Sequence, residues 1–485
     1  MTNIEIIEQL AKKRGFFYPS SEIYGGLGGF YDYGNIGTLM KRKLESLWRK
    51  FFLKEDNFFE IEPANIMHEK VFEASGHLKN FVDPIAKCKK CGTIHRADHI
   101  LEEFLKEKFE GVSSEELKNL IERHKIKCPK CRGSLEVTGA LNLMFPLGLG
   151  AEKATLGYLR PETAQGAYVN FLRQFELQRK QLPLGLAIVG KAFRNEISPR
   201  QLTTRMREFT QAELQIFFDP QKINDHEEWV KVKKYLLMLK SSSQKEVKEI
   251  SCENAVKDFK VPVFYAFYMA KVQKYFLEAL QFPKEKFRFR ELSEEEKAFY
   301  NKIHWDIELD LESLGGWKEM GGVHYRTDHD LLGHEKVSKQ PQEVFFDEKK
   351  IKPHVLELSF GIDRIVFAML DLFYVKEKDR TVLKTPSSIS PITVSVFPLV
   401  NKDGLDKKAK EVFDSVKWVL DAVYDDSGSI GRRYARADEI GTPFAITIDH
   451  ETLKDGSVTI RNRDTTKQQR IKINEIIKFI YRELG

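Results

Sequence analysis

The stretch that decides the fold is LGLAIVGKAFRNEISPRQLTTRMREFTQAELQIFFDP, residues Leu184–Pro220. Its apolar first arm and its alternating second arm predict two strands joined by a polar loop, which together form a hairpin. Strand side chains alternate between faces, so Arg194 and Glu196 point the same way and, in the expected register, share a face with Gln211 and Glu213. Charges that follow a buried run need partners. This row therefore predicts a site for an anion and an amine; an exposed sheet face with solvated charges is the alternative.

Length and composition set the broad class of the protein. A chain of 485 residues has room for two to four domains, and 42% hydrophobic with 31% charged residues is typical of a folded globular protein. A net charge of +6 with a pI near 8.7 permits a nucleic-acid partner without requiring one. The N-terminus lacks the apolar segment of a signal peptide, and no run of 18 apolar residues occurs. We therefore expect a cytoplasmic protein with no membrane partner.

Four of the five cysteines form two pairs, Cys88-x-x-Cys91 and Cys128-x-x-Cys131. Two such pairs match a four-cysteine zinc site, and because the protein would fill all four ligand positions, we expect a structural role. Cysteines without metal are the alternative, since disulfides are not expected in a reducing cytoplasm. The remaining cysteine, Cys252, is expected to be inert.

Two segments upstream of the hairpin also carry information. Residues Ile36 to Leu53 have the apolar stripe of an amphipathic helix and lead into a short strand that ends at Pro63. Farther along, a helical pattern begins at Thr163, so Glu162 lies at a strand-to-helix junction. Such a position can project one carboxylate into a cleft, or it can simply complement the helix dipole.

Downstream of the hairpin, residues 219–302 are charged and are expected to form a helical accessory segment. Strand alternation returns over residues 303–332, where pairs of glycines on both sides of Glu319 indicate sharp turns or close backbone approach. Glu319 is a candidate contact for ATP or for Mg²⁺, which binds few carboxylates and takes its other ligands from phosphates and water.

The next strand and helix are expected over residues 355–361 and 362–373. The helix has Arg364 in its first turn, where the helix dipole disfavours a cation unless an anion lies nearby. Glu357 and Ser359 share one face of the preceding strand. A bound triphosphate would supply the missing anion.

The C-terminal part reads as a separate unit. Residues 381–390 are rich in proline and serine and are expected to be a linker. Strands and helices alternate over residues 391–485, which predicts a small α/β domain. Its basic and aromatic stretches suit single-stranded RNA, although a solvated face is the alternative. These stretches are Arg432 to Arg436, followed by Arg461, Arg463, Lys467 and Arg470.

Several of these motifs resemble those of the class II aminoacyl-tRNA synthetases. FRNE followed by Arg205-x-x-x-Phe209 resembles motif 2, the helix, strand and Pro63 unit resembles motif 1, and GIDR, which ends at Arg364, resembles motif 3. RPETAQG, which contains Glu162, resembles a signature of the synthetases that charge glycine. The chain departs from that group at Leu358, where the group has proline, and at His329, where tyrosine is common. The C-terminal unit is similar to the anticodon-binding domain that the glycyl, histidyl, threonyl and prolyl enzymes share.

The resemblance implies an α+β architecture. It consists of a class II catalytic domain with an antiparallel sheet flanked by helices, a zinc-binding insertion and a C-terminal α/β anticodon-binding domain. The expected boundaries are 1–85 for the first part of the catalytic domain, 86–137 for the insertion, 138–380 for the rest of the catalytic domain with its helical insertion at about 219–302, 381–390 for the linker and 391–485 for the anticodon-binding domain. In the family, motif 1 builds the dimer interface, so a homodimer is expected.

The implied reaction joins glycine to its tRNA in two steps. Glycine and ATP form glycyl-adenylate with release of pyrophosphate, and the glycyl group then passes to the 3′-terminal ribose of tRNA(Gly). Mg²⁺ accompanies ATP, and no protein nucleophile is needed. The implied catalytic arginines are Arg194, Arg205 and Arg364. The implied ATP contacts are Arg194, Asn195, Glu196, Thr204, Arg205, Phe209, Glu319, Met320, Gly361 and Arg364.

Glycine specificity has its own logic. Glycine offers no side chain to bind, so the site must hold the ammonium group and leave no room at Cα; larger amino acids are then excluded sterically and no editing domain is required. Crowded carboxylates without a cation repel one another and predict a bound amine. The implied glycine contacts are Arg96, Glu162, Phe209, Gln211, Glu213, Arg326, Glu357, Ser359 and Gly361. The alternatives are a class II enzyme for another amino acid and an inactive, nucleic-acid-binding paralogue.

Overall fold

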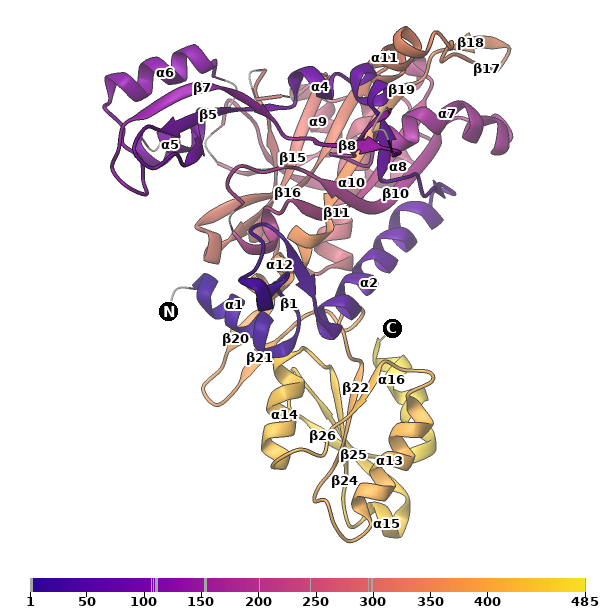
Figure 1. Cartoon of the computed structure of the whole chain (residues 1–485). Coiled ribbons are helices and arrows are strands. Elements are labelled where there is room, and N and C mark those ends of the chain that lie inside the picture. Colours follow the sequence, from indigo (N-terminus) through magenta and orange to yellow (C-terminus); the bar gives the residue numbers. More distant parts are fainter. Residues whose placement is uncertain are drawn as a thin grey trace.

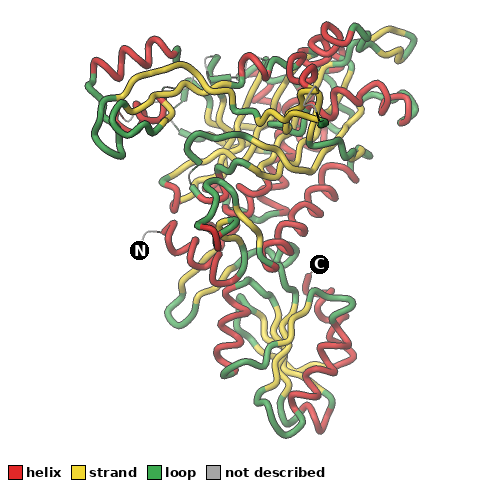
Figure 2. The backbone as a smooth tube through the Cα atoms, viewed as in Figure 1, coloured by secondary structure: helices red, strands yellow, loops and turns green. Residues whose placement is uncertain are grey.

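The computed structural model describes the chain except residues 1, 2, 106, 108, 110, 111, 152–154, 200, 245, 295, 298, 299 and 485. Figures 1 and 2 show a large N-terminal domain, a module that projects from it, and a smaller C-terminal domain that follows in sequence and lies below it in this view. Within the described residues, no helix is long and apolar enough to cross a membrane.

The large domain is built on one mainly antiparallel sheet, which has nine strands in the described part of the chain. Only the pairs β10–β3 and β12–β14, near its two edges, are parallel. In order across the sheet the strands are β13 (Lys248–Ser251), β12 (Leu236–Lys240), β14 (Phe287–Glu291), β15 (Ile303–Leu311), β16 (Gly316–Thr327), β19 (His354–Gly361), β11 (Glu208–Phe218), β10 (Leu184–Phe193) and β3 (Phe59–Glu60).

The predicted hairpin is confirmed as β10 and β11. Gly190 pairs with Gln211 and Ile188 with Glu213, so the register is regular along both arms. Strand β10 ends at Phe193, and Arg194 follows it with its backbone N–H bonded to the carbonyl of Arg207 on the other arm at 2.8 Å. The strand at 355–361 and the helix at 362–373 are also confirmed, as β19 and α12.

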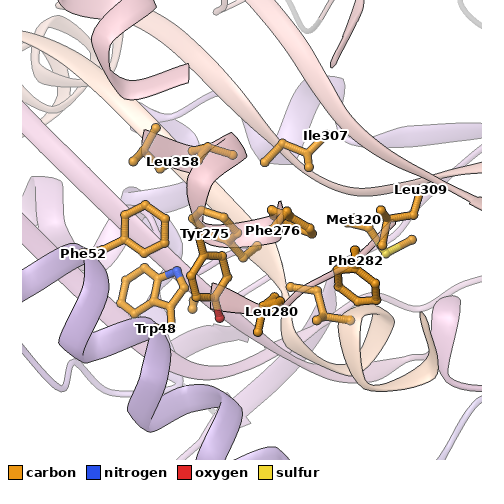
Figure 3. Packing of buried hydrophobic residues seen from close by; sticks show 14 of the residues in the cluster. Trp48, Phe52, Tyr275, Phe276, Leu280, Phe282, Ile307, Leu309, Met320 and Leu358 are labelled. Carbon is orange, nitrogen blue, oxygen red and sulfur yellow. The ribbon is translucent and has the colours of Figure 1, made fainter. Parts of the chain in front are cut away.

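One face of this sheet is covered by helices whose apolar side chains form the main core. The helices are α2 (Asn35–Arg49), which continues as a π-helical turn (Lys50–Lys54), α10 (Val263–Lys274), which continues as a second such turn (Tyr275–Ala279), and α12 (Ile362–Phe373). Figure 3 shows Trp48, Phe52, Tyr275 and Phe276 packed below Leu358 of the sheet. Because strand side chains alternate, the opposite sheet face receives Glu357 and Ser359. Leu358, the departure from the family pattern, is thus a core residue.

The expectation of a helical segment over residues 219–302 is wrong in part. Besides the helices α8 (Trp229–Val232), α9 (Cys252–Asp258) and α10, this segment supplies β12, β13 and β14 to the main sheet. Leu237, Leu239, Phe287 and Phe289 are buried at alternate positions of β12 and β14, while their neighbours are charged or partly exposed. The short strands and their many lysines and glutamates hid a period of two within what looked like charged helix.

Smaller elements frame this sheet. Two helices, α3 and α4, lead from β4 toward the module, and α7 begins just after Glu162 and packs against β10. These elements are α1 (Asn3–Arg14), β1 (Phe17–Pro19), β2 (Tyr31–Tyr33), β4 (Ile66–His68), α3 (Glu69–Ala74), α4 (His77–Asn80), β8 (Phe145–Leu149), β9 (Thr155–Leu159), α7 (Gln165–Leu177), α11 (His329–Ser338), β17 (Val344–Phe346), β18 (Lys349–Ile351), β20 (Tyr374–Lys376) and β21 (Thr381–Leu383).

The cysteines lie in a distinct module, here called the cysteine module and defined as residues 82–142. It projects at the upper left of Figure 1 and has its own small core around Cys88, Cys128, Leu101 and Leu117. Its elements are β5 (Val82–Cys88), β6 (Ile94–Arg96), α5 (Ala97–Leu105), α6 (Ser114–Arg123) and β7 (Leu135–Asn142). The spacer between the two cysteine pairs contains both helices.

The C-terminal domain alternates strands and helices as expected. Its strands lie in the order β23, β22, β24, β25 and β26. The elements are β22 (Val394–Pro398), α13 (Leu405–Val416), β23 (Ala422–Tyr424), α14 (Ile430–Glu439), β24 (Phe444–Ile448), α15 (Thr452–Asp455), β25 (Ser457–Asn462), β26 (Gln468–Lys472) and α16 (Ile476–Leu484). The last turn of α14 contacts the large domain, where Glu439 pairs with Lys13 and Arg14 of α1.

Candidate active site

A cavity of about 440 Å³ lies on the sheet face away from the core helices. Its size is within the range of small-molecule sites, about 300–1,000 Å³. Arginines of the hairpin loop and of α12 stand on its walls together with carboxylates of β11 and β19. The expected site residues that line it are Glu162, Arg194, Glu196, Thr204, Arg205, Phe209, Gln211, Glu213, Glu319, Glu357, Ser359, Gly361 and Arg364.

Arg194 is held by its stem and leaves its guanidinium tip at the cavity. Its Nε–H donates to the carbonyl of Pro161 at 3.0 Å, and its guanidinium lies over the rings of Phe81 and Phe209, 5.4 and 5.2 Å from their centroids. No carboxylate among the described residues pairs with it. The cation is therefore pre-oriented but not neutralised, which suits binding of an anion.

Arg205 and Arg364 are also fixed at their stems. Arg205 donates from Nε to Glu196 Oε2 at 2.9 Å, and its Nη1 lies 3.2 Å from His99 Nε2. Arg364 donates to the Thr204 carbonyl and pairs with Glu319 at 2.8 Å. Both arginine side chains are more than a quarter exposed, so they present charge to the cavity without full neutralisation.

Three buried carboxylates form the other end of the cavity. Glu213 of β11 accepts hydrogen bonds from the Thr163 amide and hydroxyl, at 3.1 and 2.6 Å, and from the Ser359 hydroxyl at 2.9 Å. Burial, and then the negative charges of Glu357 and Glu162, raise the pKa of Glu213 to about 7. An ammonium group next to Glu213 would relieve that cost.

The carboxylates are not without a cation, which corrects one step of the sequence argument. Arg326 is buried behind them, with Nη1 2.9 Å from Glu357 Oε2, Nη2 3.7 Å from Glu162 Oε1 and both oxygens of Asp330 within 3.0 Å. Burial raises the pKa of Glu357 despite Arg326. Burial acts the same way on Glu162, but the charges of His77 and Arg326 outweigh it and lower the pKa of Glu162.

The group still has an excess of negative charge. Glu162, Glu357 and Asp330 pair with the one guanidinium of Arg326, Glu213 does not, and the rings of Tyr168 and Tyr300 flank that guanidinium. Glu213 lines the cavity and has no ion pair with a cation among the described residues. Its raised pKa shows that its negative charge is poorly compensated. The structure therefore keeps the prediction of an amine site but narrows its centre to Glu213.

Four expected site residues do not line the cavity. Arg326 is the buried partner just described. Met320 was expected to contact ATP, but its side chain lies in the main core, because strand alternation turns Glu319 and Gly321 toward the cavity and Met320 away (Figure 3). Asn195 follows Arg194 in the chain, and its backbone N–H donates to the carbonyl of Leu143. Arg96 was expected to contact glycine, but it pairs with Asp83 and Asp98 within the cysteine module.

Sequence reasoning missed several lining residues. His304, Asp306 and Glu308 lie in a segment that was expected to be a strand but were given no role, and His324 and Tyr300 were not singled out. For the first three, the signal was the alternation of polar residues along β15, opposite a row of apolar ones. The others that line the cavity are Thr203, Met206, Thr210, Arg290, Leu292, Glu296, Gly321 and Asp363.

Asp363 joins the hairpin and α12, which carry the three arginines, to the N-terminal region. Its carboxylate accepts hydrogen bonds from Tyr33 and Lys41, both at 2.7 Å, and from the amide of Thr210 at 2.5 Å. It directly precedes Arg364 in α12. The N-terminal region, the hairpin and α12 thus meet at one buried carboxylate, which fixes the relative positions of their side chains.

Glycine is required at one crossing of the sheet. A Cβ on Gly321 would lie 1.9 Å from the carbonyl oxygen of Ser359, so no side chain fits between β16 and β19 here. Gly315 and Gly316, with φ of 76° and 121°, form the turn before Glu319. The glycine pairs around Glu319 therefore have the roles that the sequence indicated, close approach and a sharp turn.

The four cysteine sulfurs of the module form a cluster in which all Sγ atoms lie within 4.8 Å of one another. This fits a four-cysteine zinc site, whose ligands surround the metal at about 2.3 Å. Gly133 leaves the space that the cluster needs, because a Cβ there would lie 2.9 Å from Cys88 Sγ. Among the described residues, no other group of three or more such ligands converges. Cys252 is buried, and burial raises the pKa of its thiol to about 12, which disfavours the reactive thiolate.

The basic residues expected to contact RNA divide into two sets. Arg433, Arg461 and Arg463 are buried and donate to neighbouring carbonyls or to Asp438 and Asp464. This contradicts an RNA-facing role for the three, because their guanidinium groups are buried and bonded to acceptors of the protein itself. Arg432, Lys467 and Arg470 remain exposed, although Arg470 also pairs with Asp449, and the partly exposed Arg436 pairs with Asp425.

Comparison with known proteins gives concordant findings. Residues 393–483 match the family described as "Anticodon binding domain", and residues 151–373 match "tRNA synthetase class II core domain (G, H, P, S and T)". The glycine–tRNA ligase of Thermococcus sibiricus is 41% identical over 97% of this chain and 97% of its own length, and that of Methanococcus maripaludis strain C5 is 37% identical over 100% of both. The fold also resembles the crystal structure of prolyl-tRNA synthetase from Cryptosporidium parvum complexed with L-proline and AMP, with a TM-score of 0.60, 14% identity, and 100% and 76% of the two chains covered.

Proposed function

We propose a division of roles within this cavity from one premise: the chain belongs to the glycine–tRNA ligases, which are class II aminoacyl-tRNA synthetases. The protein is an aminoacyl-tRNA ligase that attaches glycine to tRNA. The observation that carries the division of roles is the polarity of the cavity. Three incompletely neutralised arginines stand at one end, and a buried carboxylate without a cationic partner among the described residues stands at the other.

The arginine end binds ATP. Arg194 holds the α-phosphate and the glycine carboxylate together, and Arg205 and Arg364 hold the γ-phosphate. The carboxylate then attacks the α-phosphorus in line while pyrophosphate leaves. Since bond making and breaking involve only the substrates, the protein contributes position and charge stabilisation. Arginine suits these positions because its planar fork binds phosphate oxygens in pairs.

Phe209 and Glu319 complete the ATP end. The Phe209 ring already supports the Arg194 guanidinium on one side, and its exposed face is available for the adenine. The Glu319 side chain is about half exposed at the cavity mouth next to Arg364, so its carboxylate fits a hydrated Mg²⁺ that accompanies the phosphates. Glu308 is less suited, because Arg288 and Arg290 already occupy its two oxygens.

The carboxylate end binds the glycine ammonium group. Glu213 supplies the charge that faces the cavity, Ser359 holds Glu213 in place, and Glu162 and Glu357 surround it with further negative potential. Arg326 acts behind them by offsetting part of the negative charge of Glu162 and Glu357. Selectivity then comes from lack of space at Cα, since adding even one methyl group to glycine introduces a clash.

The proposal also covers the metal, the tRNA partner, the oligomeric state and the domain limits. The four cysteines would hold a structural zinc ion in the cysteine module. We assign tRNA(Gly) as the partner, with the C-terminal domain toward the anticodon, and a homodimer built on the α2 region. The domain limits expected from the sequence are retained as part of the proposal. A cytoplasmic location is part of the same proposal.

The test is amino-acid-dependent ATP–pyrophosphate exchange with Mg²⁺, run with each standard amino acid. We expect exchange with glycine alone, followed by charging of tRNA(Gly) in a second assay. Exchange with a different amino acid would discard the Glu213 pocket but keep the arginine end. No exchange from a folded protein that still binds tRNA would identify an inactive paralogue.

A further inference from the structure

The cysteine module touches the arginine end of the cavity through one histidine. His99, in the first turn of α5, places Nε2 3.2 Å from Nη1 of Arg205. A guanidinium has only donors, so the imidazole nitrogen must accept this hydrogen bond with its lone pair. Arg205 is thus held from two sides, by Glu196 of the hairpin loop and by His99 of the cysteine module.

The position of His99 is fixed by the module itself. Two residues before α5, His95 places Nε2 3.4 Å from the sulfur of Cys128. Within α5, Ile100 and Leu101 are buried in the module core next to Cys88 and Cys128. The helix that carries His99 is therefore packed directly against the cysteine cluster, and its orientation depends on that cluster.

Arg96 reinforces this arrangement from the other side. It pairs with Asp83 of β5 at 2.9 Å and with Asp98 in the first turn of α5, so it ties the start of α5 to the strand that leads out of the large domain. Hydrogen bonds from Arg96 hold the pKa of Asp98 below its ordinary value, despite burial of the carboxylate. The residue expected to contact glycine instead fixes the helix that carries His99.

We propose that His99 is a positioning residue for Arg205, and that through this contact the cysteine module increases the affinity of the active site for ATP. The module is then part of the active-site architecture and does more than stabilise its own fold. The inference rests on the proposed contact of Arg205 with the γ-phosphate. It predicts a selective effect: loss of His99 weakens ATP binding and leaves glycine binding, at the other end of the cavity, unchanged.

The test compares three variants of the full-length protein. His99→Ala removes the acceptor, His99→Gln supplies a side-chain carbonyl oxygen in its place, and His124→Ala alters an exposed histidine of the same module just after α6. KM for ATP and KM for glycine are measured in glycine-dependent ATP–pyrophosphate exchange. Zinc content is measured by elemental analysis, and ATP binding by calorimetry.

For His99→Ala we expect KM for ATP to rise about fivefold to tenfold, the loss typical of one hydrogen bond to a partly exposed charged group. KM for glycine should stay within about twofold and zinc content should not change. His99→Gln should recover most of the loss, and His124→Ala should match the unaltered protein. A zinc-replete His99→Ala protein with unchanged KM for ATP overturns the proposal, and so does an equal rise in both KM values.

Metal removal provides an independent measurement. Chelation of the unaltered protein should weaken ATP binding by a factor similar to that of His99→Ala, and chelation of His99→Ala should add little, because both changes act on the same contact. Additive losses would contradict the proposal. If the unaltered protein shows no exchange with glycine, the proposed function fails, whereas calorimetric ATP binding still decides the role of His99.

Discussion

Two clusters of arginines looked alike in the sequence and differ in the structure. Arg194, Arg205 and Arg364 stand around a cavity with their stems fixed and charge left over. In the C-terminal domain, Arg433 and Arg461 are enclosed. Arg433 donates to the carbonyls of Asp426 and Gly428 at 2.7 and 2.8 Å, and Arg461 forms a two-pronged pair with Asp438 at 2.9 and 3.1 Å.

The difference shows that acceptors, and not spacing, decide what an arginine does. A buried guanidinium must satisfy its donors internally, so a neighbour such as Asp438 turns it into a structural residue. Where the fold withholds enough acceptors, the same side chain stays available for a ligand. We expect substitutions in the first cluster to change chemistry with little change in stability, and substitutions in the second to do the reverse.

The largest effect is expected at Arg194. Replacing it with lysine keeps a positive charge but loses the planar fork and the packing between Phe81 and Phe209. The rate of glycine-dependent ATP–pyrophosphate exchange should fall about 100- to 1,000-fold, as for loss of one well-placed donor to developing charge. The urea midpoint of unfolding should be nearly unchanged. Near-normal exchange would remove Arg194 from the chemistry and weaken the contrast between the clusters.

The second prediction concerns Asp438 in the C-terminal domain. Asp438→Ala leaves Arg461 buried without its carboxylate and also removes a partner of Arg380, 3.0 Å away on the β20–β21 connection. Loss of one partner of a buried ion pair costs about 3–5 kcal/mol, so unfolding of the C-terminal domain should begin at clearly lower urea. Exchange activity should persist where the large domain stays folded. Unchanged stability would show that the enclosed arginines are not structural.

The sequence predicts the features of this protein that depend on local patterns, and it fails where contacts between distant segments decide. The hairpin, the β19–α12 unit and the position of Glu162 at a strand-to-helix junction were correct, because alternation and helical spacing are local signals. The strands of residues 219–302 were missed, because their short apolar alternation is diluted by lysine and glutamate. The role of Arg326 was misjudged, since its distance to Glu357 and Glu162 depends on how two distant segments pack.

In the candidate active site, the sequence predicted which segments form the cavity better than which way their side chains face. Most of the expected site residues line the cavity, yet residue types and motifs did not separate Glu319 from its neighbour Met320, or the buried Arg433 from the exposed Arg432. Facing direction along a strand follows from register, and register is fixed by pairing partners that lie far apart in sequence. The contact between His99 and Arg205 likewise joins residues from a separately folded module and a loop.

The third prediction concerns the carboxylate end. The pKa of Glu213 is raised from an ordinary 4.5 to about 7 in the folded protein, so between these two pH values the folded state keeps a proton that the unfolded state releases. The free energy of unfolding therefore falls as pH rises from 4.5 to 7, by about 3 kcal/mol at most. Glu213→Gln should remove that cost and raise stability at pH 8 by about 1–3 kcal/mol. The same change should raise KM for glycine about tenfold, because the ammonium loses its charged partner.

The pH dependence of the unaltered protein tests the same group. Glycine needs ionised Glu213, so KM for glycine should rise about tenfold between pH 8 and pH 6, and the Glu213→Gln variant should lose that dependence. KM for ATP, measured in parallel, serves as the control. A glycine KM that does not change with pH in the unaltered protein would place the ammonium elsewhere in the pocket.

The smallest effect is expected at Arg432, and it compares two neighbours in one helix. Arg432 is exposed on α14 and Arg433 is buried, so they share sequence context and differ only in the acceptors around them. Arg432→Ala should change unfolding free energy by less than about 0.5 kcal/mol and leave exchange unaffected. It should lower kcat/KM for tRNA charging about twofold to fivefold, an effect that weakens at high salt if the contact is to phosphate. Arg433→Ala, in contrast, should destabilise the domain whether or not tRNA is present. If Arg432→Ala destabilises the domain and leaves charging intact, then exposure alone does not identify an RNA-binding arginine. The RNA-binding surface of this domain must then be sought around β26, at Lys467 and Arg470.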